Sequence, residues 1–274
     1  MSLKVRLVVI DPQKDFMDNP DSSLPVTGAN EDMNRLTKLI TRVGKRLEDI
    51  HVTLDSHRII DVGHPGFWRN DNGDSPSPFT IISADDVKNR IWTPRNPAYR
   101  QRMINYTEAL EAGKNSYKAI VWPEHCIIGS TGHNIHADLL VELKKWEKSE
   151  FANIDFVTKG TNAFTEHYGA LMAEVPDPSD PTTQLNTDFL KIMESADIVA
   201  IAGEALSHCL RATVNQIAEN IGPEHLRKFN ILADCSSPVP KVGSGPDFPA
   251  IAEAWLKDMK KLGMKLVDSK DFLA

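Results

Sequence analysis

The chain has 274 residues, of which 41% are hydrophobic and 25% are charged, so it has ample material for a buried core. Its net charge of −7 argues against a surface built to bind nucleic acid or anionic membranes. No apolar run approaches the roughly 18 residues that span a bilayer, and the first apolar stretch ends in Asp11 without a signal-peptide cleavage site. Three cysteines form an odd, sparse set that does not suggest a disulfide framework. We therefore expect a cytoplasmic protein with reduced thiols and with no nucleic-acid or membrane partner.

Short apolar runs alternate along the chain with longer amphipathic stretches. The runs predicted to be strands are Lys4–Ile10, Ile50–Leu54, Lys118–Val121, Ile154–Thr158, Ile198–Ala202 and Asn230–Ala233. The stretches predicted to be helices are Asn30–Leu47, Asn134–Lys148, Ser207–Ile221 and Pro249–Lys261. Nearly continuous apolar strands separated by helices indicate a parallel sheet that is covered on both faces. The expected fold is therefore a three-layer α/β/α fold with a six-stranded, mostly parallel sheet.

Two polar segments interrupt this alternation. Residues 66–114 contain many Pro, Asn and Asp residues and a short helical pattern at Thr107–Glu111. A second polar stretch, Pro176–Asn186, precedes the helix that leads into the fifth predicted strand. Neither is long enough for a separate domain, so residues 1–274 are expected to form one domain with a lid-like excursion at about 66–114.

Polar side chains follow five of the predicted strands at the points where the strands end. In open parallel sheets, ligands bind beyond the carboxyl ends of the strands. The residues at these ends are Asp11, Asp55 with His57, His125, Lys159 and Cys209. One edge of the sheet is therefore expected to gather carboxylates, imidazoles, an amine and a thiol.

Cys209 follows a strand and a glycine-bearing turn, near the first turn of a predicted helix. The free N–H groups at a helix N-terminus stabilise a thiolate and can hold a developing oxyanion. Asp11 and Lys159 supply an acid and an amine that could take and return the proton of the thiol. The alternatives are a small buried hydrophobe for Cys209 and a solvated helix-start lysine for Lys159.

Asp55 and His57 lie two residues apart at a strand end, so their side chains project to the same side. With His125 from another strand end, they form a mixed carboxylate and imidazole set. Such a set suits zinc, iron or manganese, and an incomplete protein shell suits a reactive site. Taken alone, the Asp-x-His pair is better explained by a helix-capping aspartate beside an exposed histidine.

Five short motifs resemble the nicotinamidase branch of the isochorismatase-like cysteine hydrolases. They are Val8–Phe16 (VVIDPQKDF), Leu54–His57 (LDSH), Val121–Cys126 (VWPEHC), Thr158–Phe164 (TKGTNAF) and Gly203–Cys209 (GEALSHC). They occur in the order of the family and cover most of the chain outside residues 66–114. The resemblance implies a six-stranded parallel sheet and the hydrolysis of nicotinamide to nicotinic acid and ammonia, a step of NAD recycling.

The resemblance also implies which residues act on the substrate. The catalytic triad of the family falls on Asp11, Lys159 and Cys209. A cis peptide is implied before Ala205, and the backbone N–H groups of Ala205 and Cys209 are implied to form the oxyanion hole. The substrate is then a small-molecule amide that passes through a cysteine thioester.

The family's metal ligands fall on Asp55, His57 and His125, with zinc expected first and iron or manganese as alternatives. Gln13 matches the position that braces the water shell of the metal, and His64 is interpreted as a residue behind the ligands. The aromatic residues expected to hold the pyridine ring are Phe16, Trp122 and Tyr168.

The sequence departs from the family near the expected pocket. It has GEALSHC where nicotinamidases more often carry GLATDYC, and Ser56 replaces the tryptophan of a D-W-H motif. These departures leave open the same chemistry on another small amide, carbamoyl or imide substrate. A non-catalytic binding or assembly protein on this scaffold is a third interpretation, which the complete triad and ligand set oppose. Family members are often oligomeric, so a homo-oligomer is also left open.

Overall fold

The computed structural model describes residues 3–113, 118–241 and 246–274. Its centre is a sheet of six strands in the order β10-β9-β8-β1-β2-β7, in which every neighbouring pair is parallel. The strands are β1 (Val5–Ile10), β2 (Asp49–Asp55), β7 (Asp155–Lys159), β8 (Ile198–Gly203), β9 (Phe229–Ile231) and β10 (Lys265–Leu266). The predicted α/β class and the six-stranded parallel sheet are confirmed.

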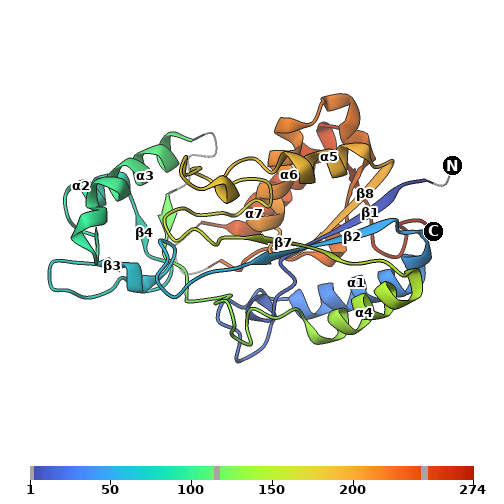
Figure 1. Ribbon diagram of the computed structural model, residues 1–274, viewed down its shortest axis with the longest axis horizontal. Coiled ribbons are helices and arrows are strands. Elements are labelled where there is room, and N and C mark those ends of the chain that lie inside the picture. The colour runs from blue at the N-terminus through green and yellow to red at the C-terminus, as the bar shows by residue number, and fades with distance from the viewer. Residues whose placement is uncertain (1–2, 114–117, 242–245) are drawn as a thin grey trace.

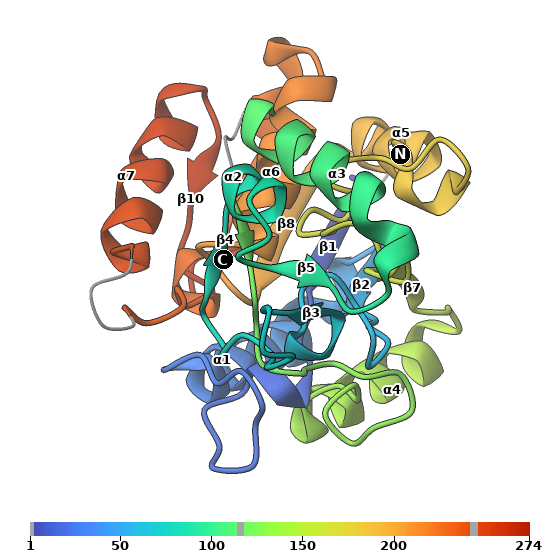
Figure 2. The ribbon, with the colours of Figure 1, turned by 90° about the vertical axis from the view of Figure 1, so that its left-hand side faces the viewer.

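Helices cover both faces of this sheet (Figure 1). On one face lie α1 (Ala29–Val43) and α4 (Ala137–Glu150), and on the other lie α5 (Thr187–Ser195) and α6 (Cys209–Asn220). The last helix, α7 (Phe248–Lys261), lies beside β10 (Figure 2), and its Trp255 indole N–H donates to Asn215 Oδ1 of α6 at 2.8 Å. The four helices predicted with bounds agree with α1, α4, α6 and α7 to within a few residues.

Burial explains why these strands could be recognised. All six residues of β1 are buried, because β2 and β8 flank it and helices cover both of its faces. Such a strand must be apolar along its whole length, and its one charged residue, Arg6, forms ion pairs with Glu48 at 3.2 Å and Asp49 at 3.1 Å.

The predicted third strand, Lys118–Val121, does form a short strand, but the expectation that it belongs to the main sheet is wrong. The structure has β6 (Ala119–Ile120) there, paired antiparallel with β4 (Ile81–Ile82) in a separate two-stranded sheet. Ala119 and Val121 are buried against residues of the excursion rather than in the main core. The sixth strand of the main sheet is β10, which is too short and too polar to be recognised from its sequence.

The excursion lies beyond the carboxyl ends of the main strands (Figures 1 and 2). Its described elements are β3 (Trp68–Arg69), β4, α2 (Ala84–Lys88), β5 (Thr93–Pro94) and α3 (Arg100–Ala112). Thus α3 is longer than the expected Thr107–Glu111, and α2 was not expected. The predicted last residue of the excursion, Lys114, lies outside the described residues. Short 3-10 helices of the chain occupy Lys14–Phe16, Gly44–Arg46, Pro65–Phe67, Pro97–Tyr99, Pro181–Thr183, Pro223–Lys228 and Ala233–Cys235.

The excursion packs on a hydrophobic cluster of its own, which we call the second cluster. Its buried members are Val62, Phe67, Trp68, Ile82, Val87, Met103, Tyr106, Leu110, Ala119 and Val121. This cluster is distinct from the main cluster around the six-stranded sheet. The excursion is therefore held by apolar packing as well as by its short strands.

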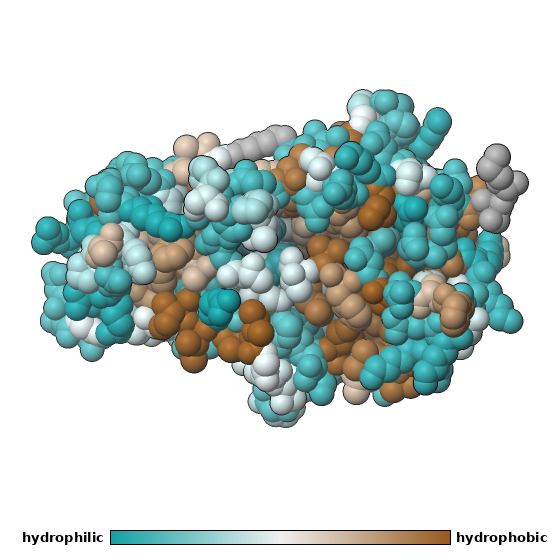
Figure 3. Space-filling view, in the orientation of Figure 1, coloured by the Kyte–Doolittle hydropathy of each residue, from teal (hydrophilic) through white to brown (hydrophobic). Residues whose placement is uncertain are grey.

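The edge strand β7 is open on one side of the main sheet. Its Phe156 keeps 47% of its surface exposed, and apolar side chains gather over the middle of the face shown in Figure 3. A second chain could pair with an uncovered edge strand of this kind. The homo-oligomer stays a prediction. Among the described residues, no helix combines the length and apolarity needed to cross a membrane.

Candidate active site

Groups from the end of β2 and from the segments that follow β1 and β8 surround Lys159, the last residue of β7. Its ammonium Nζ lies 2.9 Å from Asp11 Oδ2, 3.1 Å from Asp55 Oδ1 and 3.6 Å from Cys209 Sγ. Lys159 is 1% exposed, and in the register of β2 and β7 it lies directly opposite Asp55. One lysine therefore joins the predicted triad to the predicted metal ligands.

Opposing carboxylates keep this buried lysine charged. Burial lowers the pKa of Lys159, but Asp11 and Asp55 outweigh that effect and raise the pKa well above its usual value. The ammonium is therefore a permanent positive charge next to the thiol.

Thr53, in β2, holds the carboxylate of Asp11. Its hydroxyl accepts a hydrogen bond from the Asp11 backbone N–H at 2.9 Å and donates to Asp11 Oδ1 at 2.5 Å. Burial raises the pKa of Asp11, against the opposing effect of the Lys159 ammonium. A carboxylate with a raised pKa is a better proton acceptor, and its second oxygen is left for Lys159 and Cys209.

Cys209 is the first residue of α6 and is 6% exposed. Burial raises the pKa of its thiol well above the usual value, which the Lys159 ammonium opposes only in part, and the thiol hydrogen-bonds to Asp11. Burial thus favours the thiol over the thiolate, and the candidate base Asp11 lies beside it. Its activation needs proton transfer rather than the helix dipole alone.

The turn before Cys209 brings backbone N–H groups to the pocket. Gly203 has φ +113°, and a Cβ there would lie 2.1 Å from the Ile10 carbonyl oxygen, so only glycine fits. The peptide between Glu204 and Ala205 is cis, as expected. Because Cys209 begins a helix, its N–H lies outside the hydrogen-bond ladder of that helix, and Ala205 and Cys209 line the same pocket.

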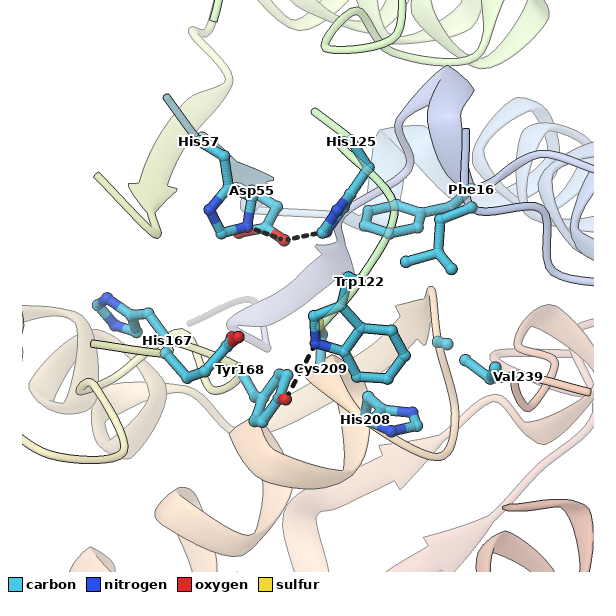
Figure 4. A pocket seen from close by; sticks show the side chains of 13 residues that line it. Phe16, Asp55, His57, Trp122, His125, His167, Tyr168, His208, Cys209 and Val239 are labelled. Atoms are coloured by element: carbon cyan, nitrogen blue, oxygen red, sulfur yellow. Dashed lines mark hydrogen bonds and ion pairs between the residues drawn. The ribbon is translucent and has the colours of Figure 1, made fainter. Parts of the chain in front are cut away.

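Asp55, His57 and His125 bring their ligand atoms within 4.8 Å of one another (Figure 4). Asp55 Oδ2 lies 3.1 Å from His57 Nε2 and 3.6 Å from His125 Nε2. The other ring nitrogens are held in place, since His57 Nδ1 lies 3.2 Å from Asp61 Oδ2 and His125 Nδ1 lies 2.8 Å from the Pro123 carbonyl oxygen. A histidine held at one nitrogen in this way presents the other to a metal, so the donor set fits zinc, iron or manganese.

Gln13 and His64 lie next to this set in different ways. The side-chain amide of Gln13 clamps the backbone of Asp55: it accepts from the Asp55 N–H and donates to the Asp55 carbonyl oxygen, both at 2.7 Å. Gln13 therefore holds the end of the ligand strand, and its place beside a metal's water shell stays a prediction. The His64 ring meets the rings of His57 and His125 at 5.1 and 5.4 Å between centroids, and its Nε2 has no hydrogen-bond partner among the described residues. Its role behind the ligands stays a prediction.

One pocket contains Cys209, the three candidate ligands and the three predicted aromatic residues. The Trp122 indole N–H donates to Tyr168 Oη at 3.2 Å, and the two rings are nearly perpendicular at 89° (Figure 4). Phe16 lies against His125 on the ligand side. The pocket volume is about 30 Å³, tighter than the roughly 300–1,000 Å³ of most ligand pockets, so a ring-sized substrate has to shift part of the wall.

Further residues line the pocket for which the motifs had suggested no role: Leu24, Glu166, His167, His208 and Val239. Burial raises the pKa of Glu166 to about 8 and lowers the pKa of His208 to about 3, so both are neutral near pH 7. His208 could have been suspected because it precedes the nucleophile candidate. Glu166, Thr53 and Asp61 carry no comparable signal, because only the fold brings them to the site.

Known proteins resemble this chain in structure but not detectably in sequence. No protein-family model matches it, and no curated protein matches it. The yeast nicotinamidase aligns with a TM-score of 0.62 and 21% identity over 96% of this chain and 99% of the yeast chain. The zinc-bound pyrazinamidase of Pyrococcus horikoshii aligns with a TM-score of 0.56 and 19% identity over 97% and 99%.

An isochorismatase family protein from Desulfovibrio vulgaris aligns with a TM-score of 0.53 and 15% identity over 99% of this chain and 97% of the other. At identities this low, the similarities establish the fold alone. The whole described chain therefore has the fold of nicotinamidases and isochorismatase-like hydrolases.

Proposed function

We propose that this protein is a nicotinamidase-like amidohydrolase that cleaves a small amide through a cysteine thioester. The observation that carries the proposal is the buried Lys159, whose ammonium contacts Asp11, Cys209 and Asp55 at once. A thiol, its base and a cation, beside a carboxylate–imidazole set, suit acyl transfer from an amide. The shared fold with the yeast nicotinamidase supports nicotinamide as the first substrate to test. Its product, nicotinic acid, would enter NAD recycling.

In the proposed reaction, Asp11 accepts the thiol proton of Cys209 while the sulfur attacks the carboxamide carbon. The carbonyl oxygen takes the negative charge, and the N–H groups of Ala205 and Cys209 stabilise it. Asp11 returns the proton to the amide nitrogen, the carbon–nitrogen bond breaks, and ammonia leaves a thioester. Asp11 then takes a proton from water, which attacks the thioester and releases the acid, and the thiol regains its proton. Lys159 remains protonated throughout and stabilises the negative charge as it moves between Asp11 and the sulfur of Cys209.

Asp55, His57 and His125 are the residues that would hold one divalent metal ion, and zinc is supported by its presence in the Pyrococcus horikoshii pyrazinamidase. When bound, such an ion supplies a Lewis acid that can bind and orient a ring nitrogen or polarise an oxygen. Gly160 lets the Asp55 carboxylate approach, because it has φ +75° and a Cβ there would lie 2.6 Å from Asp55 Oδ1. Gln13 holds the backbone of the same aspartate.

A second candidate function is the same chemistry on a larger amide, carbamoyl or imide substrate. A cavity of about 470 Å³ lies next to the tight pocket and shares Tyr168 and His208 with it. Lys118 and Arg211 line this outer cavity together with apolar side chains such as Phe248. Displacement of the His208 ring would join the two spaces and admit a substrate with an apolar or anionic extension.

The deciding experiment measures ammonia release from nicotinamide by the wild-type protein and by Cys209→Ala, with metal content determined on both preparations. Turnover that is lost in the variant, with an unchanged unfolding temperature, supports the proposal. Folded, metal-loaded protein that releases no ammonia excludes nicotinamide, and a panel of larger amides and ureido compounds then tests the second candidate. Turnover retained by Cys209→Ala would refute the thioester mechanism.

A further inference from the structure

Glu204 and Asp32 are two acidic side chains buried behind the turn that leads to Cys209. We call residues 203–207 the nucleophile turn. Glu204 is 0% exposed, and Asp32, in α1, is 2% exposed. The two side chains hydrogen-bond to each other although both are acids. Neither the thiol chemistry nor the metal ligands account for this pair.

The hydrogen bonds of the pair leave one oxygen on each carboxyl group. Asp32 Oδ1 accepts from Arg35 Nη2 at 2.6 Å, and Glu204 Oε2 accepts from the Ser237 N–H at 3.3 Å. Asp32 Oδ2 and Glu204 Oε1 have no other hydrogen-bond partner among the described residues. We assign the contact within the pair to these two oxygens. Two carboxylate oxygens repel, so one of them must carry a proton.

The charges around the pair favour one proton. Arg35, 40% exposed at its side chain, is the cation that faces Asp32, and its Nε also donates to the Asp234 carbonyl oxygen. The Asp234 carboxylate is engaged elsewhere, because it accepts from the Ser269 N–H and hydroxyl, both at 2.7 Å. Cys235, the other titratable group here, is buried, and burial raises the pKa of its thiol to about 12. One guanidinium thus balances one negative charge, and burial together with Asp32 raises the pKa of Glu204 well above its usual value.

The pair ties the nucleophile turn to α1. The Glu204 N–H donates to the Ile10 carbonyl oxygen at 2.8 Å, which fixes its backbone on β1. The neighbouring segment braces the rest of the turn, since Leu206 N–H donates to Ser237 O at 2.9 Å and Val239 N–H donates to Ser207 Oγ at 3.0 Å. The Glu204 side chain is therefore the contact that joins this braced turn, which carries the Ala205 N–H, to α1.

We propose that Glu204 is a positioning residue for the oxyanion hole and that the proton it shares with Asp32 holds the nucleophile turn in its active geometry. Loss of that proton puts two negative charges in contact in a buried site. The two side chains then separate, and the Ala205 N–H moves away from the place where the oxyanion forms. The kinetic part of this inference rests on the proposed function, whereas the shared proton itself does not.

The test compares Glu204→Gln with Glu204→Leu. The Gln amide donates to Asp32 at every pH, whereas Leu removes the hydrogen bond. We expect Glu204→Leu to lower kcat by about tenfold with a smaller change in KM, and Glu204→Gln to restore most of that loss. As the pH rises through the raised pKa of Glu204, the wild-type kcat should fall on an alkaline limb that Glu204→Gln lacks. Glu174→Gln, which alters a largely buried carboxyl group outside the turn, should keep the wild-type limb.

A second readout is the unfolding temperature as a function of pH, which needs no substrate. A buried acid with a raised pKa stabilises the fold when protonated, so wild-type stability should fall as the pH rises through the raised pKa of Glu204. This dependence should weaken in Glu204→Gln. It would do so even if the protein hydrolysed no amide, which separates failure of this inference from failure of the proposed function.

The two readouts test the shared proton and the positioning role separately. An alkaline limb and a stability profile that are the same in Glu204→Gln as in the wild type would overturn the shared proton. A changed stability profile with an unchanged kcat limb would show a structural pair that does not position the oxyanion hole. If Glu204→Gln does not fold, Asp32→Asn provides the same two readouts, because its amide also removes the contact between two acids.

Discussion

The strand ends of the main sheet and the second cluster are both buried, but they contain different kinds of side chain. At the strand ends of the main sheet, Asp11, Asp55 and Lys159 are all at most 5% exposed and compensate one another's charge. The second cluster under the excursion is apolar, and the Trp68 indole N–H in it donates to the Val62 carbonyl oxygen at 2.7 Å. Charge pairing at the strand ends determines how the site residues react, whereas packing in the second cluster determines the shape of the pocket wall.

The two regions meet at the wall of the pocket. The backbone N–H of Trp122 donates to the Gly63 carbonyl oxygen at 2.7 Å, directly beside the second cluster. Changes in the charged region should therefore abolish turnover, whereas changes in the second cluster should act through stability and substrate binding.

The largest effect is expected for Lys159→Met. Removing the ammonium leaves the buried Asp11 carboxylate without a cation and takes away one partner of Asp55, which should cost about 3–5 kcal/mol of unfolding free energy. Activity should fall by about 10³-fold or more, since the charge next to the thiol is lost. Denaturant unfolding and ammonia release measure the two effects, with the exposed Lys145→Met as the control. A variant as stable as the wild type would contradict the ion network.

Thr53→Val should come next. Valine has nearly the same shape but cannot hold the Asp11 carboxylate, so we expect kcat to fall by about 10- to 100-fold as proton transfer is misaligned. Stability should fall by about 1–3 kcal/mol, because a buried N–H and a carboxylate oxygen lose a partner. Thr37→Val, at a half-buried position of α1, should leave kcat unchanged. A kcat within twofold of the wild type for Thr53→Val would remove Thr53 from the site.

Trp68→Ala tests the second cluster. The cavity should cost about 3–5 kcal/mol of stability. KM should rise several-fold because the wall at Trp122 loosens, while kcat should change by less than about threefold at temperatures where the variant is folded. Trp255→Ala, in the main cluster beside α6, is the matched control and should lower stability without raising KM. Equal KM changes in the two variants would show that the second cluster does not shape the pocket.

The smallest effect is expected for Glu166→Gln, measured on protein stripped of metal with a chelator. Burial raises the pKa of Glu166 to about 8, so its contribution to stability is complete below the usual carboxyl pKa and is lost as the pH rises through about 8. The Gln variant should lose less stability between about pH 5 and 9 than the wild type. Parallel stability profiles would show that Glu166 titrates normally.

Local sequence patterns were enough to predict five of the six strands of the main sheet and four of the helices that cover it, because buried parallel strands must be apolar and covering helices must be amphipathic. They failed for Lys118–Val121, which is as apolar as a central strand but pairs with β4 inside the excursion. A short run does not specify its partner, and β10, with two residues, has almost no pattern at all.

The sequence by itself determined which chemical groups follow each strand: Asp11, Asp55 with His57, Lys159 and Cys209, since strand ends are readable from the apolar runs before them. Only the tertiary structure decided how these groups are held, because their supports come from distant segments. Thr53 faces Asp11 through the register of β1 and β2, and Asp32 meets Glu204 across the packing of α1 on the sheet. Burial, which raises the pKa of Asp11 and of Glu204, belongs to the packed fold and to no local stretch of the chain.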